Sequence, residues 1–257
     1  MDPVGKTDMG RLRVNNEDSL FVSGAKFHAL PNLFIVADGM GGHNAGEIAS
    51  VEAINKFKEY SAATPLKKNE ILDYIVAGCV YANDGVYDLS RANYSYSGMG
   101  TTFSLCVLAK KRLYISHIGD SRIYAVYKDK IRLLTADHTY VFEMQKLGQI
   151  TEEQAKTHPK RNVLIKVLGV ERGVKFDGFV YEIDCEKILL CSDGLTNMLS
   201  DDEILSNMHG TNTEIADRLI SNANQNGGAD NITLILFDVT EVFKNASGAG
   251  RHNKRPL

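Results

Sequence analysis

Short apolar runs joined by two-residue turns fill residues 101 to 134 and strongly constrain the fold. Phe103, Leu105 and Val107 alternate with smaller residues, and polar turns at 110–111 and 128–129 separate successive runs. This pattern is typical of antiparallel strands, so the segment is predicted to form a meander. Two amphipathic stretches before it, 47–60 and 70–89, predict long helices over one face of a sheet. The 257 residues, 44% of them hydrophobic, are enough for one large α+β domain.

The stretch Asp38-Gly39-Met40-Gly41-Gly42-His43 follows the apolar run 33–37, which is predicted to be a buried strand. A carboxylate at the end of such a strand must be hydrogen-bonded, paired or bound to a cation. The glycines let the backbone approach a small ligand closely, and His43 adds a group that titrates near neutral pH. Asp-Gly alone is more often an ordinary turn. The combination predicts a metal-centred active site.

Three more aspartates occur in matching contexts. Asp193 ends an apolar run and precedes glycine, Asp120 follows a run and a glycine, and Asp230 precedes the last run after two glycines. Carboxylates at strand ends can meet at one rim of stacked sheets, where their mutual repulsion requires cations. Oxygen ligands of this kind suit Mg²⁺ or Mn²⁺ rather than zinc, which prefers His or Cys. The four acids together predict a divalent metal site.

Two such ions about 3.5–4 Å apart form the clamp used in metal-assisted phosphoryl hydrolysis. An arginine such as Arg13 could grip phosphate oxygens as a bidentate fork. His43 could protonate the departing alkoxide as a general acid. Without such a site, Arg13 would be a surface charge and Glu17-Asp18 a turn before a strand at 20–22.

In this order the chain contains RxNNED, DGMGGHxxGE, GDSR, DHT, SDGL and GGxDNIT. The set resembles the metal-dependent serine/threonine protein phosphatase family of the 2C type, over about residues 5 to 240, and matches its short bacterial members best. The resemblance implies a four-layer α-β-β-α sandwich, with two stacked antiparallel sheets flanked by helices. It also implies hydrolysis of phosphoserine and phosphothreonine monoesters by direct attack of a water or hydroxide that bridges two divalent ions.

The resemblance also assigns the metal ligands. Asp38 would bridge both ions, the Gly39 carbonyl would bind one of them, and Asp193 and Asp230 would bind the other. The residues expected to act mainly through metal-bound waters are Glu17 and Asp18. The ions would be Mn²⁺ or Mg²⁺, since both accept these oxygens.

Further roles come from the same resemblance. Arg13 would hold the phosphate, His43 matches the general acid, and Asp120 matches the ligand of a possible third metal. Residues 137–169, a polar stretch with helix signals at 140–147 and 151–154, correspond to the family's mobile flap. Thr139 and Lys166 stand where Ser and Arg are common, and neither touches the inferred metal site. The expected partners are phosphoproteins, above all a bacterial Ser/Thr kinase and its targets.

Two alternatives compete with this interpretation. Cys106 and Arg112 have the Cys-x5-Arg spacing of cysteine-dependent phosphatases, but their spacer lacks glycine and belongs to a strand and its turn. We therefore treat the spacing as chance. The second alternative is a catalytically silent, phosphoprotein-binding member of the same fold. Such members usually lose metal ligands, whereas every expected acid is present here.

Bulk properties exclude several other classes. The net charge of -3 gives no sign of a nucleic-acid or membrane surface, and no apolar run approaches a membrane span. The four cysteines lie in hydrophobic segments without CxxC pairing, which indicates reduced thiols in a cytoplasmic protein. We expect a monomer with a catalytic domain over residues 1–243 and a disordered basic tail over residues 244–257.

Overall fold

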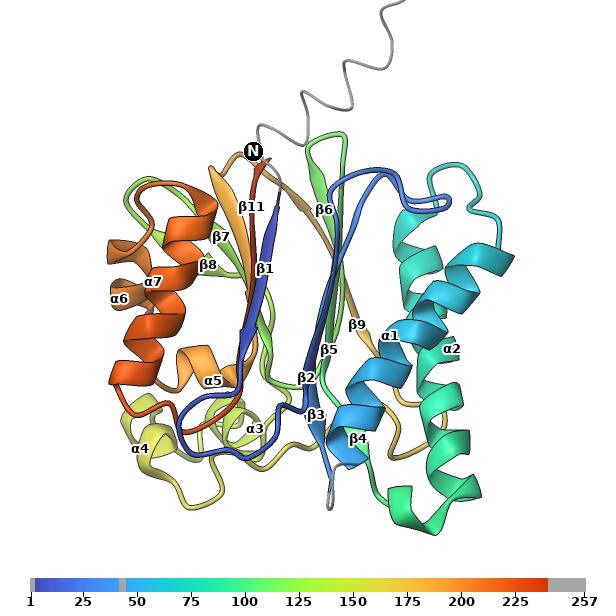
Figure 1. Ribbon diagram of the computed structural model, residues 1–257, viewed down its shortest axis with the longest axis horizontal. Helices are drawn as coiled ribbons and strands as arrows, with labels where there is room; N and C mark the ends of the chain where they lie inside the picture. Colours follow the sequence, from blue (N-terminus) through green and yellow to red (C-terminus); the bar gives the residue numbers. More distant parts are fainter. Residues whose placement is uncertain (1–2, 42–44, 240–257) are drawn as a thin grey trace, which may run out of the picture.

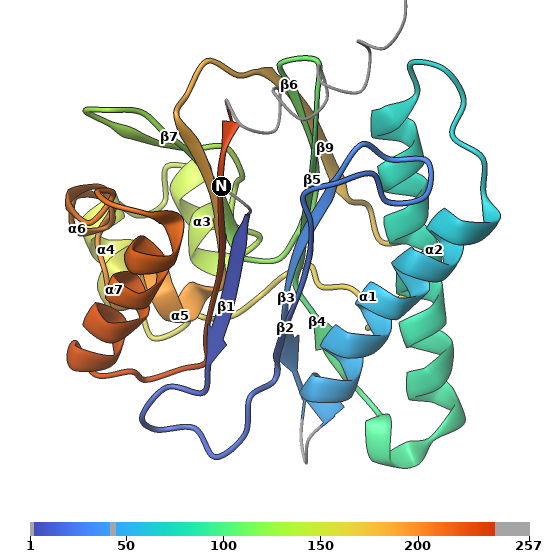
Figure 2. The same ribbon diagram turned by 45° about the horizontal axis from the view of Figure 1, so that its top comes forward.

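The computed structural model describes residues 3–41 and 45–239, which form two antiparallel sheets stacked face to face. Helices cover the outer face of each sheet, so the layers run helix, sheet, sheet, helix (Figure 1). The same layers remain distinct when the molecule is turned by 45° (Figure 2). The predicted four-layer α+β sandwich is confirmed.

The first sheet has five strands and holds both ends of the described chain. In spatial order they are β1 (Val4–Asp8), β11 (Ile232–Asp238), β10 (Lys187–Cys191), β7 (Arg122–Val126) and β8 (Ile131–Leu133). Alternate residues of β11 face opposite layers: Ile235 and Phe237 join the core between the sheets, while Leu234 and Leu236 join the core under the helices. The sequence did not predict β1, because its half-exposed residues carry no apolar alternation.

The second sheet has six strands. The main path is β2 (Asp18–Ser23), β3 (Leu33–Met40), β5 (Phe103–Ala109), β6 (Arg112–Ile118) and β9 (Asp177–Glu182), and short β4 (Gly100–Thr101) pairs with β3. Strand β3 is buried on both faces, which explains its continuous apolar run. Phe34 of β3 stacks on Phe237 of β11 with ring centroids 4.0 Å apart, and this contact joins the two sheets.

Long helices α1 (Ala45–Ala63) and α2 (Ile71–Ala92) pack against each other and against the second sheet, as predicted. The remaining helical elements are η1 (Tyr94–Tyr96), α3 (Tyr140–Lys146), α4 (Glu152–Thr157), α5 (Asp193–Thr196), α6 (Asp201–Ser206) and α7 (Asn212–Gln225). Helices α5 to α7 cover the outer face of the first sheet, and the core between them is the one that Leu234 and Leu236 join. No helix within the described ranges is long and apolar enough to cross a membrane.

The prediction of one continuous meander over residues 101 to 134 is wrong. Strands β5 and β6 do form a hairpin through Lys110 and Lys111. Strand β6 then pairs with β9, whereas β7 pairs with β10 and β8 in the other sheet. The link between β6 and β7, which contains Asp120, is thus a crossover between sheets. Strands β9 and β10, which follow one another in the chain, likewise belong to different sheets.

The insertion over residues 137–169 contains α3 and α4, close to the predicted helical positions. Thr151 caps α4, and Gln154 completes a capping box at the predicted helix signal over 151–154. The far end of the insertion returns to the second sheet, where Leu168 exchanges backbone hydrogen bonds with Thr101. The predicted tail over residues 244–257 lies outside the described residues.

Candidate active site

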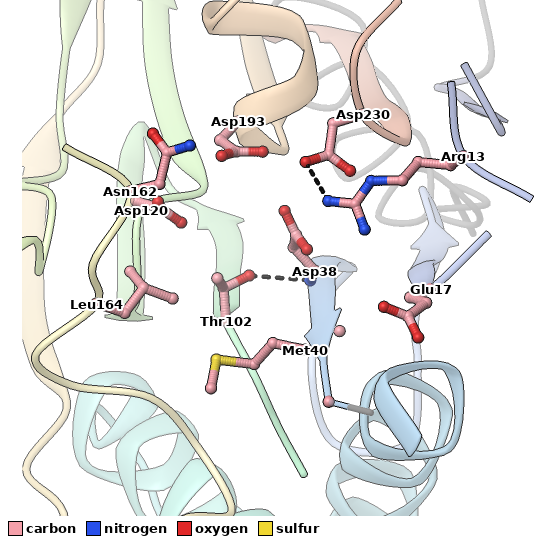
Figure 3. A pocket seen from close by; sticks show the side chains of 12 residues that line it. Arg13, Glu17, Asp38, Met40, Thr102, Asp120, Asn162, Leu164, Asp193 and Asp230 are labelled. Atoms are coloured by element: carbon pink, nitrogen blue, oxygen red, sulfur yellow. Dashed lines mark hydrogen bonds and ion pairs between the residues drawn. The ribbon is translucent and has the colours of Figure 1, made fainter. Parts of the chain in front are cut away.

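A pocket of about 240 Å³ opens at the end of the sheet stack where β3 ends and α5 begins. Its walls come from segments far apart in the sequence. The lining residues are Arg13, Glu17, Asp38, Gly39, Met40, Gly41, Thr102, Asp120, Asn162, Leu164, Asp193 and Asp230. Figure 3 shows the carboxylates of Asp38, Asp193 and Asp230 pointing toward one another. The predicted convergence of acids at one rim is confirmed.

Asp38 has every backbone polar group engaged by neighbouring residues. Its N–H donates to the Thr102 hydroxyl at 2.9 Å, and its carbonyl accepts from the Thr102 N–H and the Thr101 hydroxyl, both at 2.9 Å. The backbone is therefore fixed and the carboxylate faces the pocket. Burial raises the pKa of Asp38 well above its ordinary value, and the charges of Asp18 and Asp193 raise it further.

Asp18 lies opposite Asp38 in the register of β2 and β3 but does not line the pocket. Its Oδ2 accepts from the Ser192 hydroxyl at 2.8 Å, while its Oδ1 is buried with no hydrogen-bond partner among the described residues. Burial raises the pKa of Asp18 to about 7, with added repulsion from Asp193. A buried, half-satisfied carboxylate of this kind requires a cation or water to complete its contacts.

Glu17 lines the pocket and is held through its backbone. Its N–H donates to Asn231 Oδ1 at 2.9 Å, and its carbonyl accepts from the Gly39 N–H at 3.1 Å. The end of β3 can approach α1 this closely only with glycine at position 39, because a Cβ on Gly39 would clash with the carbonyls of Glu17 and Gly46. The glycine of the Asp-Gly motif therefore has a packing role in addition to its predicted role as ligand.

Asp193 and Asp230 approach from the other sheet. Asp193 is the first residue of α5, and its Oδ2 accepts from Asn197 Nδ2 at 3.0 Å, while its buried Oδ1 has no partner among the described residues. Burial raises the pKa of Asp193 to about 6, and the charge of Asp230 contributes. Asp230 precedes β11, and its Oδ1 accepts from the Asn231 N–H at 2.8 Å.

Among the described residues that line the pocket, Arg13 is the one basic side chain. Its Nη2 pairs with Asp230 Oδ2 at 2.8 Å (Figure 3), and 47% of its side chain is exposed. The loop that carries it is anchored on both sides, since Asn231 Nδ2 donates to the carbonyls of Met9 and Asn15, each at 2.9 Å. The arginine is thus presented at the mouth of the acidic pocket, where an anion would arrive.

Asp120 occupies the sheet crossover between β6 and β7 and lines the side of the pocket opposite Arg13 (Figure 3). Burial raises the pKa of Asp120 well above its ordinary value, and Asp193 and Asp137 add to the effect. The position matches the predicted separate acid, set apart from the Asp38–Asp193–Asp230 group.

The donor set fits divalent cations. Acidic groups from both sheets are buried together, their pKa values are raised by burial and mutual repulsion, and two of their oxygens lack partners among the described residues. Within the described residues, no three acidic, histidine or cysteine side chains converge closely enough to hold one ion by themselves. Backbone carbonyls and waters would therefore complete the coordination, as hard cations commonly allow.

Sequence reasoning missed part of the lining. Thr102 supports Asp38 through its hydroxyl, and Asn162, Leu164 and Met40 complete the walls. The signal for Thr102 was its position just before an apolar run, but a threonine there is unremarkable without the tertiary contact. Asn162 and Leu164 belong to the insertion, whose return to the pocket no local pattern predicts.

Two sequence-based hypotheses have different outcomes. His43 lies outside the described residues, so its role stays a prediction. Cys106 is fully buried in the middle of β5, where burial raises the pKa of its thiol far above the ordinary value. Arg112 pairs with exposed Glu182. A buried, protonated thiol on a strand cannot act as a phosphatase nucleophile, so the Cys-x5-Arg spacing is indeed chance.

Comparison with known proteins agrees with this geometry. The family model described as protein phosphatase 2C matches residues 13–233. The serine/threonine phosphatase stp of Listeria monocytogenes serotype 4b is 39% identical over 254 residues, which cover 94% of this chain and 98% of that protein.

Solved structures of phosphatases are also similar to this chain over most of its length. The serine/threonine phosphatase Stp1 from Staphylococcus aureus has a TM-score of 0.85 at 34% identity, covering 91% of this chain and 93% of that one. The catalytic domain of the phosphatase PstP, in complex with 2 manganese ions, has a TM-score of 0.79 at 32% identity, covering 92% and 96%. The chain therefore belongs to the protein phosphatase 2C family of serine/threonine phosphatases.

Proposed function

We propose that this enzyme hydrolyses phosphoserine and phosphothreonine in proteins with two divalent cations held between Asp38, Asp193 and Asp230. The observation that supports the proposal is the pocket in which these acids meet beside Arg13, with Asp193 Oδ1 buried and without a hydrogen-bond partner among the described residues. When bound, Mn²⁺ or Mg²⁺ would neutralise the acids, polarise the phosphoryl group and lower the pKa of water in the pocket. Manganese is present in the PstP structure, which supports the same class of ion here.

The side chains would divide the work by position. Asp38 would help to hold both cations. The Gly39 carbonyl would be a further ligand of one cation, and Asp193 and Asp230 would be ligands of the other. Glu17 and Asp18 would hold waters, since Asp18 lies behind the lining and has one oxygen without a partner in the described part of the chain. Asp120 would serve a third cation.

Arg13 would bind the substrate phosphate. Its Nη2 already pairs with one carboxylate oxygen of Asp230 at 2.8 Å, and a phosphate offers two oxygens for a bidentate contact once cations neutralise Asp230. His43 remains the proposed proton donor to the leaving serine or threonine oxygen. The insertion over residues 137–169 would act as a flap, since its Asn162 and Leu164 form one wall of the pocket.

The proposed setting follows the same reasoning. The substrates would be phosphoproteins, among them a bacterial Ser/Thr kinase and its targets, and the catalytic domain over residues 1–243 would act as a monomer in the cytoplasm. The net charge of -3 gives no sign of a surface for nucleic acid or a membrane.

The test is hydrolysis of p-nitrophenyl phosphate and of a phosphothreonine peptide after treatment with EDTA and stepwise return of Mn²⁺. We expect no turnover without the metal, full recovery with it, and near-complete loss in Asp38→Ala and Asp193→Ala at any Mn²⁺ concentration. A folded wild-type protein that never turns over would instead favour a phosphoprotein-binding role.

A further inference from the structure

His138 of the DHT motif, residues 137–139, has been given no role so far, yet it contacts the crossover that carries Asp120. The side chain of His138 is only 6% exposed. Its Nδ1 accepts from the Gly119 N–H at 3.1 Å, and its own backbone N–H donates to the Gly119 carbonyl at 2.8 Å. His138 thus engages both backbone polar groups of the residue directly before Asp120.

The remaining neighbours of Asp120 are held as firmly. The Ser121 hydroxyl shares a 2.7 Å hydrogen bond with the Thr102 hydroxyl, and its carbonyl accepts from Ser104 at 3.0 Å. Arg122 forms a bidentate ion pair with Asp137, with Nη2 to Oδ2 at 2.7 Å. Gly119 has a φ of +105°, and a Cβ added at this position would clash with Thr102. The turn therefore depends on glycine and on the hydrogen bonds that neighbouring segments make to it.

The tautomer of His138 follows from its partners. Since Nδ1 accepts a hydrogen bond, the ring proton must sit on Nε2, which donates to Asp177 Oδ2 at 3.2 Å. Burial lowers the pKa of His138 below its ordinary value, so the ring is neutral at pH 7 and Nδ1 stays an acceptor. Asp177 therefore orients the ring, and the ring in turn holds the Gly119 amide.

We infer that His138 is a positioning residue that fixes the carboxylate of Asp120 in the active site by accepting the Gly119 N–H. It touches neither substrate nor metal and acts only through the crossover. The inference rests on the proposed role of Asp120 for its effect on turnover, but not for its effect on the crossover itself.

Two substitutions separate the two ends of the ring. In His138→Asn the side-chain amide places a polar atom where Nδ1 lies, so the acceptor for Gly119 is kept. In His138→Gln the amide reaches the position of Nε2, so the contact with Asp177 is kept and the acceptor for Gly119 is lost. Asn32→Ala is the matched control, because Asn32 is 1% exposed and also hydrogen-bonds both backbone groups of one residue. Its Oδ1 accepts from the Leu108 N–H, and its Nδ2 donates to the Leu108 carbonyl. Leu108 lies about 20 Å along β5 from Thr102.

The first measurement is amide hydrogen exchange at Gly119 by NMR in EDTA-treated protein. We expect exchange about fivefold to tenfold faster in His138→Ala and His138→Gln, as for one lost hydrogen bond, and near wild type in His138→Asn and Asn32→Ala. Equal exchange in His138→Asn and His138→Gln would overturn the inference, whatever Asp120 does.

The second measurement is turnover of a phosphothreonine peptide with Mn²⁺. His138→Gln should lower kcat about tenfold with KM within about twofold, whereas His138→Asn and Asn32→Ala should keep kcat within about twofold. In an Asp120→Ala background, His138→Gln should have little further effect, because both changes act on one group. A full additional loss there would contradict positioning through Asp120. If Asp120→Ala alone left turnover unchanged, the proposed role of Asp120 would fail, and the exchange at Gly119 would still decide the inference.

Discussion

Replacing Asp193 with asparagine should stabilise the metal-free protein while removing a metal ligand. Asp193 is a buried acid whose pKa is raised from 3.8 to about 6 by burial and by Asp230. Because the pKa of Asp193 is raised in the folded state, the folded protein binds a proton at Asp193 more tightly than the unfolded chain does. The resulting stability is fully present below about pH 4 and is lost as the pH rises to about 6. Above that range, the metal-free protein carries an unfavourable buried charge.

The size of the effect follows from the shift. About two pKa units correspond to about 3 kcal/mol, and we expect about 2 kcal/mol because neighbouring acids share the repulsion. Asparagine keeps an oxygen for the Asn197 hydrogen bond and carries no charge. With about 2–4 °C per kcal/mol for a chain of this size, the Tm should rise by about 4–8 °C.

The assay is thermal unfolding in EDTA at pH 8 and pH 4, then at pH 8 with Mn²⁺. Asp193→Asn should melt above wild type at pH 8, equal it at pH 4, and respond less to Mn²⁺. The matched control is Asp238→Asn, because Asp238 is also partly buried, with 15% of its side chain exposed, but is paired with Lys187. The free energy of unfolding of that variant should fall by about 3 kcal/mol, as expected when a buried ion pair is broken. If Asp193→Asn were destabilised in EDTA like the control, or kept its advantage at pH 4, the charge-repulsion account would be refuted.

Three other substitutions test separate parts of the site. Arg13→Ala should raise KM for p-nitrophenyl phosphate about tenfold with a smaller change in kcat, and an unchanged KM in initial-rate kinetics would count against phosphate binding. Cys106→Ser should keep Mn²⁺-dependent turnover within about twofold per folded molecule, whereas lost activity in the variant, with EDTA-resistant activity in the wild type, would indicate thiol chemistry. Asn231→Ala removes hydrogen bonds to Glu17, Met9 and Asn15, and should lower the free energy of unfolding in urea by about 2–4 kcal/mol. A loss under about 1 kcal/mol would show that Asn231 does not anchor the N-terminal loop.

Much of the fold could be predicted because its main elements have strong local patterns. The continuous apolar run of β3 and the helical spacing of α1 and α2 each require a particular element to bury them. Lys110 and Lys111 both take positive φ, 49° and 63°, in the tight hairpin predicted between β5 and β6.

Strand partners were not predictable in the same way. Alternation tells which residues face a core but not which sheet a strand joins, so the crossover at Gly119–Ser121 was indistinguishable from another hairpin turn. Strand β1 carried no signal, because at a half-exposed sheet edge it needs little apolar surface.

The site was predictable where chemistry alone demanded it. Buried acids repel, so the four aspartates near glycines were predicted to share cations, and the structure brings them together. The supporting contacts that Thr102, Ser192 and Asn231 make with Asp38, Asp18 and Met9 were not predictable, because they join residues 64, 174 and 222 positions apart in the chain. Their hydroxyl and amide groups are ordinary in sequence and gain meaning only from their partners.

The central claim is that the carboxylate cluster holds two divalent cations that the reaction requires. Titration calorimetry with Mn²⁺ on EDTA-treated protein tests it most directly, with Asp38→Asn as the comparison. The account predicts at least two Mn²⁺ ions bound per wild-type chain, with loss of binding at both positions in Asp38→Asn because Asp38 would contact both ions. A wild-type chain that binds no Mn²⁺, or an Asp38→Asn variant that binds it like wild type, would contradict the account.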